Sequence, residues 1–232
     1  PLALSAAVAI ELLHCASLVH DDLPCFDDAT LRRGKPTVHA AFGERIAVLT
    51  GDALIVAAFE QMAKGAARST HPERACLATA AVAAGVGAPN GICAGQAWEC
   101  EPRVDVSQYH RAKTAALFIA STTAGAAAAG VDQAQWAELG CAIGEAYQVA
   151  DDIHDATAAH AALGKQTGID VALDRPSAVR ELGLDGAVKR LGECIEKGVA
   201  AIPPCAGREL LIHIVQRQSE RFFPAKADAP AA

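Results

Sequence analysis

Alanine dominates this chain and limits what it can fold into, because 54 of the 232 residues are alanine. Alanine has the highest helix propensity, whereas the aromatic residues, which favour strands, make up only 4% of the chain. No segment of useful length shows the alternation of apolar and polar residues that marks a half-buried strand. The sequence therefore predicts an all-α fold in which helices pack as a bundle with short loops.

Glycine, proline and aspartate divide the chain into helical segments. The expected helices cover residues 2–22, 44 or 47 to 67, 69–84, 92–101, 105–129, 132–162, 177–182, 184–201 and 207–222. Segments 31–36 and 164–175 are expected to be loops. Since no internal repeat is present, we expect one domain over residues 1–232, with 224–232 as a flexible tail. The apolar periodicity already runs at residue 2, so we expect further N-terminal helices of this domain to precede it.

The formal net charge of −7 disfavours a nucleic-acid partner, which would require a basic face. Locally placed arginine and lysine side chains can still bind phosphorylated ligands. The longest uncharged run, residues 114–131, is too weakly apolar to predict a membrane span. The eight cysteines lack the spacing of a zinc site, which is typical of free thiols in a reducing cytoplasm.

Two clusters of aspartate, at residues 21–28 and 151–155, concentrate negative charge within short segments. Such crowding disfavours folding unless something compensates it. Carboxylate oxygens suit hard cations, and Mg²⁺ prefers a few carboxylates together with water and substrate phosphates. The alternative for either cluster taken singly is a solvated acidic surface.

The second cluster has a readable geometry if it is helical. At 100° per residue, Gln148, Asp151 and Asp155 lie within about 60° of one another. Gly144 lies on the same stripe and is expected to leave a gap beside these side chains. Tyr147 is expected to face elsewhere.

Four cations accompany the clusters. Arg32 and Arg33 follow the first cluster, Lys113 precedes Thr114 on a predicted helix, and Lys165 lies in the loop after the second cluster. Carboxylates, Mg²⁺ and Arg or Lys side chains together predict a site for a phosphate-rich ligand.

These motifs and their order resemble those of the trans-isoprenyl diphosphate synthases, the class I prenyltransferases. The matching segments are residues 20–28, 31–34, 51–52, 95–96, 113–114, 147–155 and 164–170. Segment 175–183 is most similar to bacterial geranylgeranyl diphosphate synthases. The resemblance implies an isoprenoid synthase-type helical bundle around a central active-site cavity.

The resemblance also implies the chemistry: an allylic diphosphate is joined to isopentenyl diphosphate with the help of three Mg²⁺ ions. The implied metal-binding residues are Asp21, Asp27 and Asp151 as direct ligands, and Asp22, Asp152 and Asp155 through metal-bound water. The implied diphosphate-binding residues are Arg32, Lys113 and Lys165 for the allylic substrate, Arg33 for isopentenyl diphosphate, and Arg175, which stands where many members have lysine. Thr114 and Gln148 are implied to shield the allylic cation with their oxygen atoms.

Product length should depend on the residues one turn before the first cluster. Ala16 and Ser17 lie five and four residues before Asp21, and both are small. Farnesyl synthases of this family usually carry a bulky aromatic residue near this position. The small residues therefore favour a C20 product, geranylgeranyl diphosphate, with C15 and C25 as alternatives and Leu12 and Leu13 as a floor.

Other readings stay open at this stage. A non-catalytic regulatory subunit could keep the same fold, and a class I terpene cyclase also uses Asp-rich metal sites.

The resemblance implies a homodimer, for which the small apolar run 115–129 could serve as the interface, although a position in the core suits this run equally. Asp52 could orient an arginine or cap a helix, and Glu99 stands where many members have aspartate. The family's basic segment before the first cluster has no counterpart in residues 1–20, so we expect an incomplete isopentenyl site.

Overall fold

Helices make up almost all regular structure in the computed structural model, which describes residues 1–101, 108–109, 111–161, 177–219 and 222. The helices are α1 (Leu2–Asp21), α2 (Val38–Phe42), α3 (Glu44–Ala67), α4 (Pro72–Val86), α5 (Ile92–Trp98), α7 (Ala116–Ala129), α8 (Ala134–Ala161), α10 (Ala178–Ala200) and α11 (Arg208–Ser219). A π-helix, η1 (Arg111–Ala115), precedes α7, and two short strands, β1 (Leu31–Arg32) and β2 (Lys35–Pro36), form a hairpin. The all-α prediction is therefore confirmed, with this hairpin as the exception among the described residues.

Most helices lie where the sequence predicts them. The break predicted at residue 183 is present, because Gly183 has a φ of 71° and interrupts α10. Three local features were not predicted: the single-turn helix α2, the hairpin within the expected loop 31–36, and the π-helix within the expected α-helix 105–129.

The main core forms where α1, α3, α4 and α7 meet. Buried residues recur on α1 every three or four positions, at Leu2, Ala6, Ala9 and Leu13, as a helix facing a core requires. They pack against a group of mostly small residues from the neighbouring helices: Ala58, Met62, Ala75, Ala78, Val82, Ala124 and Ala127. Small side chains allow close approach of the helices, which explains how a chain so poor in aromatic residues fills its core.

The alanine-rich run 115–129 is part of this core. Ala116, Ala120 and Ala124 are buried within the chain. A Cβ on Gly85 of α4 would lie 2.5 Å from the Ala120 Cβ, so α4 and α7 are in close contact. The run is therefore a core segment rather than a surface for a second copy.

By length and composition, α1 and α3 could each cross a membrane, contrary to the expectation drawn from the longest uncharged run. In the fold, however, Ala9 and Leu13 of α1 belong to the same buried cluster as Ala58 and Met62 of α3. Core helices of soluble proteins pass the same test, so these helices are weak evidence for a span.

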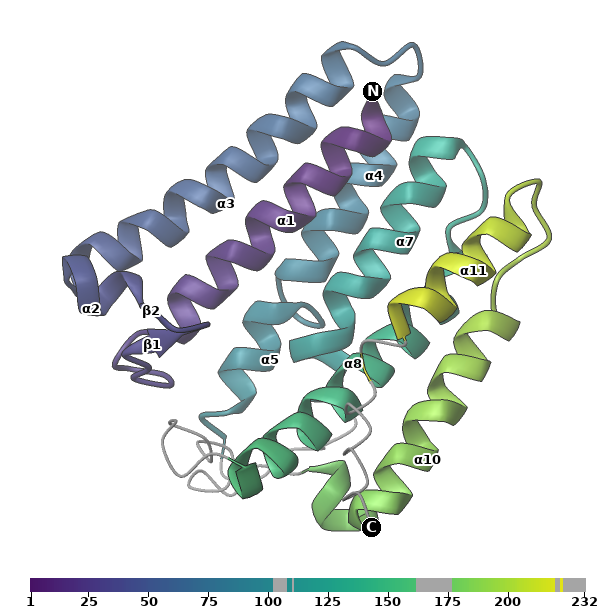
Figure 1. Cartoon of the computed structure of the whole chain (residues 1–232). Coiled ribbons are helices and arrows are strands. Elements are labelled where there is room, and N and C mark those ends of the chain that lie inside the picture. Colours follow the sequence, from purple (N-terminus) through teal and green to yellow (C-terminus); the bar gives the residue numbers. More distant parts are fainter. Residues whose placement is uncertain (102–107, 110, 162–176, 220–221, 223–232) are drawn as a thin grey trace.

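The elements that carry the two aspartate clusters gather at one end of the bundle. In Figure 1, α1 and α3 lie side by side, and the hairpin and α2 lie at the C-terminal end of α1. The C-terminal part of α8 and the short helix α5 lie toward the same end of the molecule. A second buried cluster, which includes Ile153 and Leu191, joins α8 to α10.

Candidate active site

The first aspartate cluster forms a tight turn at the end of α1. Asp21 is the last residue of α1, and Pro24 follows shortly after it. The chain then folds back, and the backbone N–H of Asp27 donates to the carbonyl oxygen of Asp21 at 3.0 Å. Because four residues separate Asp22 from Asp27, the turn places Asp27 beside the end of α1.

The hairpin after this turn positions Arg32. Its turn residues, Arg33 and Gly34, have φ values of 51° and 75°, the left-handed pair of a type I′ turn that suits a two-residue hairpin. Arg33 is exposed at the turn. Arg32 donates from Nε to both carboxylate oxygens of Asp22, at 2.9 and 3.0 Å. The Nη2 atom of Arg32 lies 2.7 Å from Asp22 Oδ1. These bonds raise the pKa of Arg32, and Asp22 is only 4% exposed.

Asp21 is held differently, by a neutral group. Gln96 of α5 donates from Nε2 to Asp21 Oδ1 at 2.7 Å. Two cations lie farther away: Lys113 Nζ is 3.8 Å from Oδ1, and Arg32 is 3.9 Å from Oδ2. The amide therefore orients the carboxylate without neutralising its charge.

Lys113 and Thr114 lie in the π-helix η1, a feature frequently found at functional sites. Lys113 Nζ donates to Glu99 Oε1 at 2.5 Å, and the hydroxyl of Tyr109 donates to the same oxygen. A Cβ on Gly95 would lie 2.5 Å from the backbone nitrogen of Lys113. The glycine of the Gly95-Gln96 pair thus allows α5 to approach η1 and sets the position of Lys113.

Thr114 connects η1 to α8. Its hydroxyl donates to Gln148 Oε1 at 2.6 Å, and Gln148 Nε2 donates to Asp152 Oδ1 at 3.0 Å. Asp152 Oδ2 in turn accepts from the backbone N–H of Ala178 at 2.7 Å, at the start of α10. Through these two bonds Asp152, a predicted metal-site residue that is only 7% exposed, links α8 to the start of α10.

One cavity of about 440 Å³ brings the two clusters together. Asp21 lines it from α1 and Asp151 from α8, although 130 positions separate them in the sequence. Arg32, Lys113 and Thr114 line the same cavity. Asp155 follows one turn after Asp151 on α8 and is exposed.

One expectation about α8 was wrong. Tyr147 lines this cavity with Asp151, one turn away, and burial followed by the Asp151 charge raises its pKa. The gap expected beside Gly144 is present, because Gly144 lines a separate pocket with Gln148 and Asp152. On its Cβ side, however, Gly144 packs closely on η1, since a Cβ there would lie 2.5 Å from Ala115 Cα. Helical spacing gave the relative directions of these side chains but not which neighbour each would meet.

A second, mainly apolar cavity of about 280 Å³ lies beside the first. Leu13, Ala16 and Ser17 line it from α1, and Val86 and Ile92 line it from α4 and α5. Ser17, Ile92 and Gln96 line both cavities. The small residues predicted to govern product length thus lie next to the carboxylate-lined cavity.

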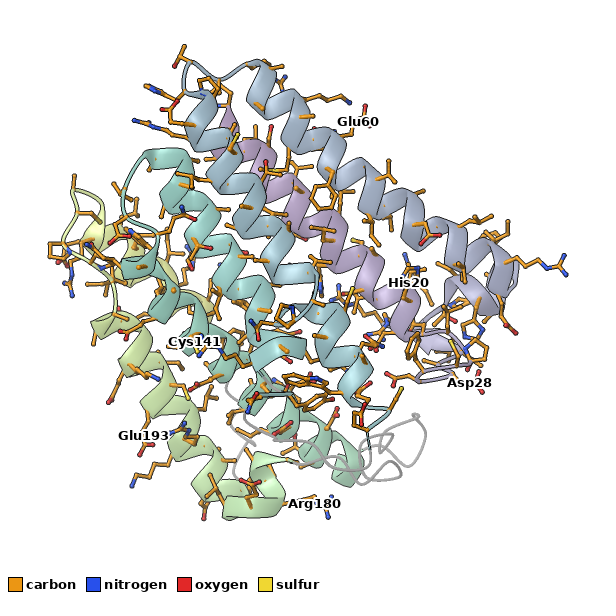
Figure 2. The ribbon with its side chains drawn as sticks, turned by 180° about the vertical axis from the view of Figure 1, so that it is seen from behind. His20, Asp28, Glu60, Cys141, Arg180 and Glu193 are labelled. Carbon is orange, nitrogen blue, oxygen red and sulfur yellow. The ribbon has the colours of Figure 1, made fainter. Side chains whose placement is uncertain are left out.

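His20 fixes the end of α1 against α3, which Figure 2 shows from behind. Its Nε2 lies 3.3 Å from the carbonyl oxygen of Val48 and 3.9 Å from Asp52 Oδ1. Any Cβ on Gly51 would overlap the imidazole, at 2.0 Å from Nε2. Asp52 lies inside α3, so it is not a helix cap, and the described side chain that it approaches is a histidine rather than an arginine.

The carboxylates and cations around the cavity suit Mg²⁺ bound together with a phosphorylated substrate. Within the described part of the chain, no three His, Cys, Asp or Glu side chains are placed to hold one ion by themselves. Mg²⁺ is usually bound by one or two carboxylates and completes its shell with water and substrate phosphates. Asp21 and Asp151 facing one cavity with Arg32 and Lys113 fit that mode of binding. Lys165 and Arg175 lie outside the described residues.

The sequence analysis missed three contributors to this site. Glu99 and Tyr109 were given no role, yet both bond within the network that holds Lys113. Gln96 was noted only as part of a motif, yet it orients Asp21. The available signals were the family motif that contains Gln96, the acidic position of Glu99, and their spacing of about one helical turn.

Comparison with known proteins gives consistent matches. A family model described as polyprenyl synthetase matches residues 1–202. A geranylgeranyl diphosphate synthase from Cereibacter sphaeroides is 55% identical over 225 residues, covering 97% of this chain and 77% of that protein. A protein of the same name from Rhodobacter capsulatus is 48% identical with the same coverage. The crystal structure of a Helicobacter pylori geranyltransferase complexed with magnesium and isoprenyl diphosphate superimposes with a TM-score of 0.79 at 30% identity, covering 94% of this chain and 74% of that one.

Proposed function

Because the chain belongs to the polyprenyl synthetase family, we propose that it is a Mg²⁺-dependent prenyltransferase that makes geranylgeranyl diphosphate. Its substrates would be an allylic diphosphate of five, ten or fifteen carbons and isopentenyl diphosphate. The observation that carries the proposal is the cavity in which Asp21 and Asp151 face Lys113 and Arg32. Such a cavity suits a ligand whose diphosphate is held partly through cations and partly through metal ions.

The reaction begins with loss of diphosphate from the allylic substrate. The C–O bond breaks, and the electron pair leaves with the diphosphate. Mg²⁺ held by Asp21, Asp27 and Asp151, and through water by Asp22, Asp152 and Asp155, would supply charge stabilisation for the leaving group. Lys113 and Arg32 add fixed positive charge beside it, and Lys165 and Arg175 are proposed to do the same.

The allylic cation then forms a new C–C bond with the double bond of isopentenyl diphosphate, which Arg33 is proposed to hold. Loss of a proton, taken by the released diphosphate, restores a double bond. Thr114 lines the cavity and donates its hydroxyl hydrogen to Gln148, so its oxygen lone pairs are directed away from that bond. Thr114 would thus shield the cation, and Gln148 would act by orienting Thr114.

The C20 product length is supported by the apolar cavity beside Ala16 and Ser17. These small side chains leave space next to the carboxylate-lined cavity, where an aromatic residue would fill it. A C15 or C25 product is the alternative, and so is a non-catalytic subunit that lends its fold to an active partner.

A prenyl transfer assay tests the proposal. The protein is incubated with Mg²⁺, labelled isopentenyl diphosphate and farnesyl diphosphate, and the products are separated by chain length. A C20 product is expected. A product of another length would correct the chain length, and Mg²⁺-dependent diphosphate binding without any product would favour the regulatory subunit.

We also propose that the chain is a single domain that works as a cytoplasmic homodimer. On α3, Ile46, Leu49 and Val56 are large apolar residues with exposed side chains, as a helix at an interface between copies would have. Light scattering on the purified protein checks this, and a monomer at micromolar concentration would contradict it.

A further inference from the structure

We propose that Glu99 is a positioning residue that keeps Lys113 off Asp21, so that Asp21 retains the charge it needs to bind a divalent cation. The inference rests on the proposed function, since it concerns the same carboxylate-lined cavity. It assigns a role to a side chain that does not line that cavity itself.

Lys113 lies near two carboxylates and donates a hydrogen bond to only one of them. Its Nζ is 2.5 Å from Glu99 Oε1 and 3.8 Å from Asp21 Oδ1. All three side chains are mostly buried, with exposed fractions of 20% for Lys113, 17% for Asp21 and 15% for Glu99. Partial burial reduces screening by solvent, so the choice of partner has a large electrostatic consequence.

Glu99 is itself anchored. The hydroxyl of Tyr109, a buried residue of the segment before η1, donates to the oxygen that accepts from Lys113. The Tyr109 ring also lies 5.9 Å from Lys113 Nζ, within the range of a cation–π contact. Glu99 and Tyr109 together therefore hold the ammonium group at 3.8 Å from Asp21 Oδ1.

The other cation beside Asp21 is held in the same manner. Arg32 forms its short bonds with Asp22, at 2.7 to 3.0 Å, and stays 3.9 Å from Asp21. The one short side-chain bond described for Asp21 comes from the neutral amide of Gln96. Two separate carboxylates thus accept the short hydrogen bonds of the two cations, so neither cation occupies a carboxylate oxygen of Asp21 at hydrogen-bond distance.

The consequence for metal binding follows from competition. A lysine ammonium in contact with Asp21 would have to be displaced before a cation could bind there. With Glu99 present, the ammonium remains close enough to meet a diphosphate oxygen but does not occupy the metal ligand. Without the Glu99 charge, the ammonium should move to Asp21.

The test is a double-mutant cycle on metal binding in the absence of substrate. Mn²⁺ alone serves as the probe, and its binding is read from the loss of the free-ion electron paramagnetic resonance signal. Glu99→Gln should weaken Mn²⁺ binding about tenfold, a change within the usual range for coupled charged groups. Glu101→Gln, the same substitution at an exposed residue two positions away, should leave the affinity within about twofold.

The cycle separates positioning from a general loss of negative charge. In a Lys113→Met background, Glu99→Gln should change Mn²⁺ affinity by less than about twofold, because no ammonium remains to be displaced. Glu99→Asp, which keeps the charge, should recover most of the wild-type affinity. Circular dichroism confirms that each variant is folded.

Any of three results overturns the inference. An equal loss in both backgrounds would show that Glu99 acts only as distant charge, and unchanged affinity in Glu99→Gln or undetectable Mn²⁺ binding in the wild type would show that there is no competition. A wild type that makes a prenyl product yet shows one of these results refutes only this inference. A wild type that completes the cycle as expected but makes no product refutes only the proposed function.

Discussion

Gly95 offers the sharpest test of how the active site is built, because its missing side chain lets α5 lie against η1. In Gly95→Ala, the new Cβ would lie 2.5 Å from Lys113 N, 2.6 Å from its Cα and 2.8 Å from its Cβ. Ordinary contact begins at 3.4 Å. These neighbours are mainly backbone, so no flexible side-chain end can move aside, and η1 must shift away by about 1 Å.

The size of the effect follows from two opposing terms. Overpacking costs about 1–3 kcal/mol, whereas replacing a helical glycine by alanine gains up to about 1 kcal/mol. The net loss of about 1–2 kcal/mol should lower Tm by about 2–8 °C for a domain of this size. A shift of about 1 Å at Lys113 should also reduce kcat by about tenfold to a hundredfold, since catalysis depends steeply on position.

Gly125→Ala is the matched control. Gly125 also lies inside a helix, α7, but a Cβ there would meet nothing within 4 Å. That variant should gain about 0.5–1 kcal/mol and keep wild-type kcat. Thermal unfolding and the prenyl transfer assay measure both quantities. If Gly95→Ala matched the wild type in Tm and kcat, or if both variants lost activity equally, the close approach would not position Lys113.

Three further predictions test other parts of the molecule. Ala16→Tyr should fill the apolar cavity of about 280 Å³ and shorten the product from C20 toward C15, and chromatography showing an unchanged product would remove Ala16 from the wall of the chain-length cavity. Asp152→Ala should lower the free energy of unfolding by about 1–3 kcal/mol, because the half-buried Ala178 N–H and the Gln148 amide both lose an acceptor; denaturant unfolding without Mg²⁺ measures this, and an unchanged midpoint would argue against the link between α8 and α10. Burial lowers the pKa of His14 from its ordinary value of 6.5. As pH falls, the unfolded chain therefore binds a proton at this residue before the folded chain does, so stability present above pH 6.5 should be lost as pH falls through the lowered pKa. A His14→Gln variant should show a smaller loss of unfolding midpoint between about pH 7.5 and 5.5.

Local rules were sufficient for most helices and for Asp21, Asp151 and the cations that line the candidate cavity, but not for the side chains that bond to them. Alanine content, proline and glycine positions predicted α1, α3, α4 and α8, and the kink at Gly183 was located from its sequence alone. The hairpin at residues 31–36 was missed because Arg33 adopts a positive φ, which a non-glycine residue rarely does. The π-helix was missed because nothing in the periodicity of residues 105–129 distinguishes one π turn from a continuous α-helix.

By itself, the sequence determined that the chain is helical, and it predicted that two aspartate clusters and a set of cations form one site and that Ala16 and Ser17 leave space. Only the tertiary structure decided which pairs meet. It placed Asp21, Asp151 and Tyr147 around one cavity. It also made Asp22 the hydrogen-bond partner of Arg32 and Glu99 that of Lys113. The physical reason is that helical periodicity fixes side-chain directions only relative to one axis. Which partner a charge meets depends on how separate helices pack, and here that packing depends on glycines such as Gly95, where two backbones come within contact distance.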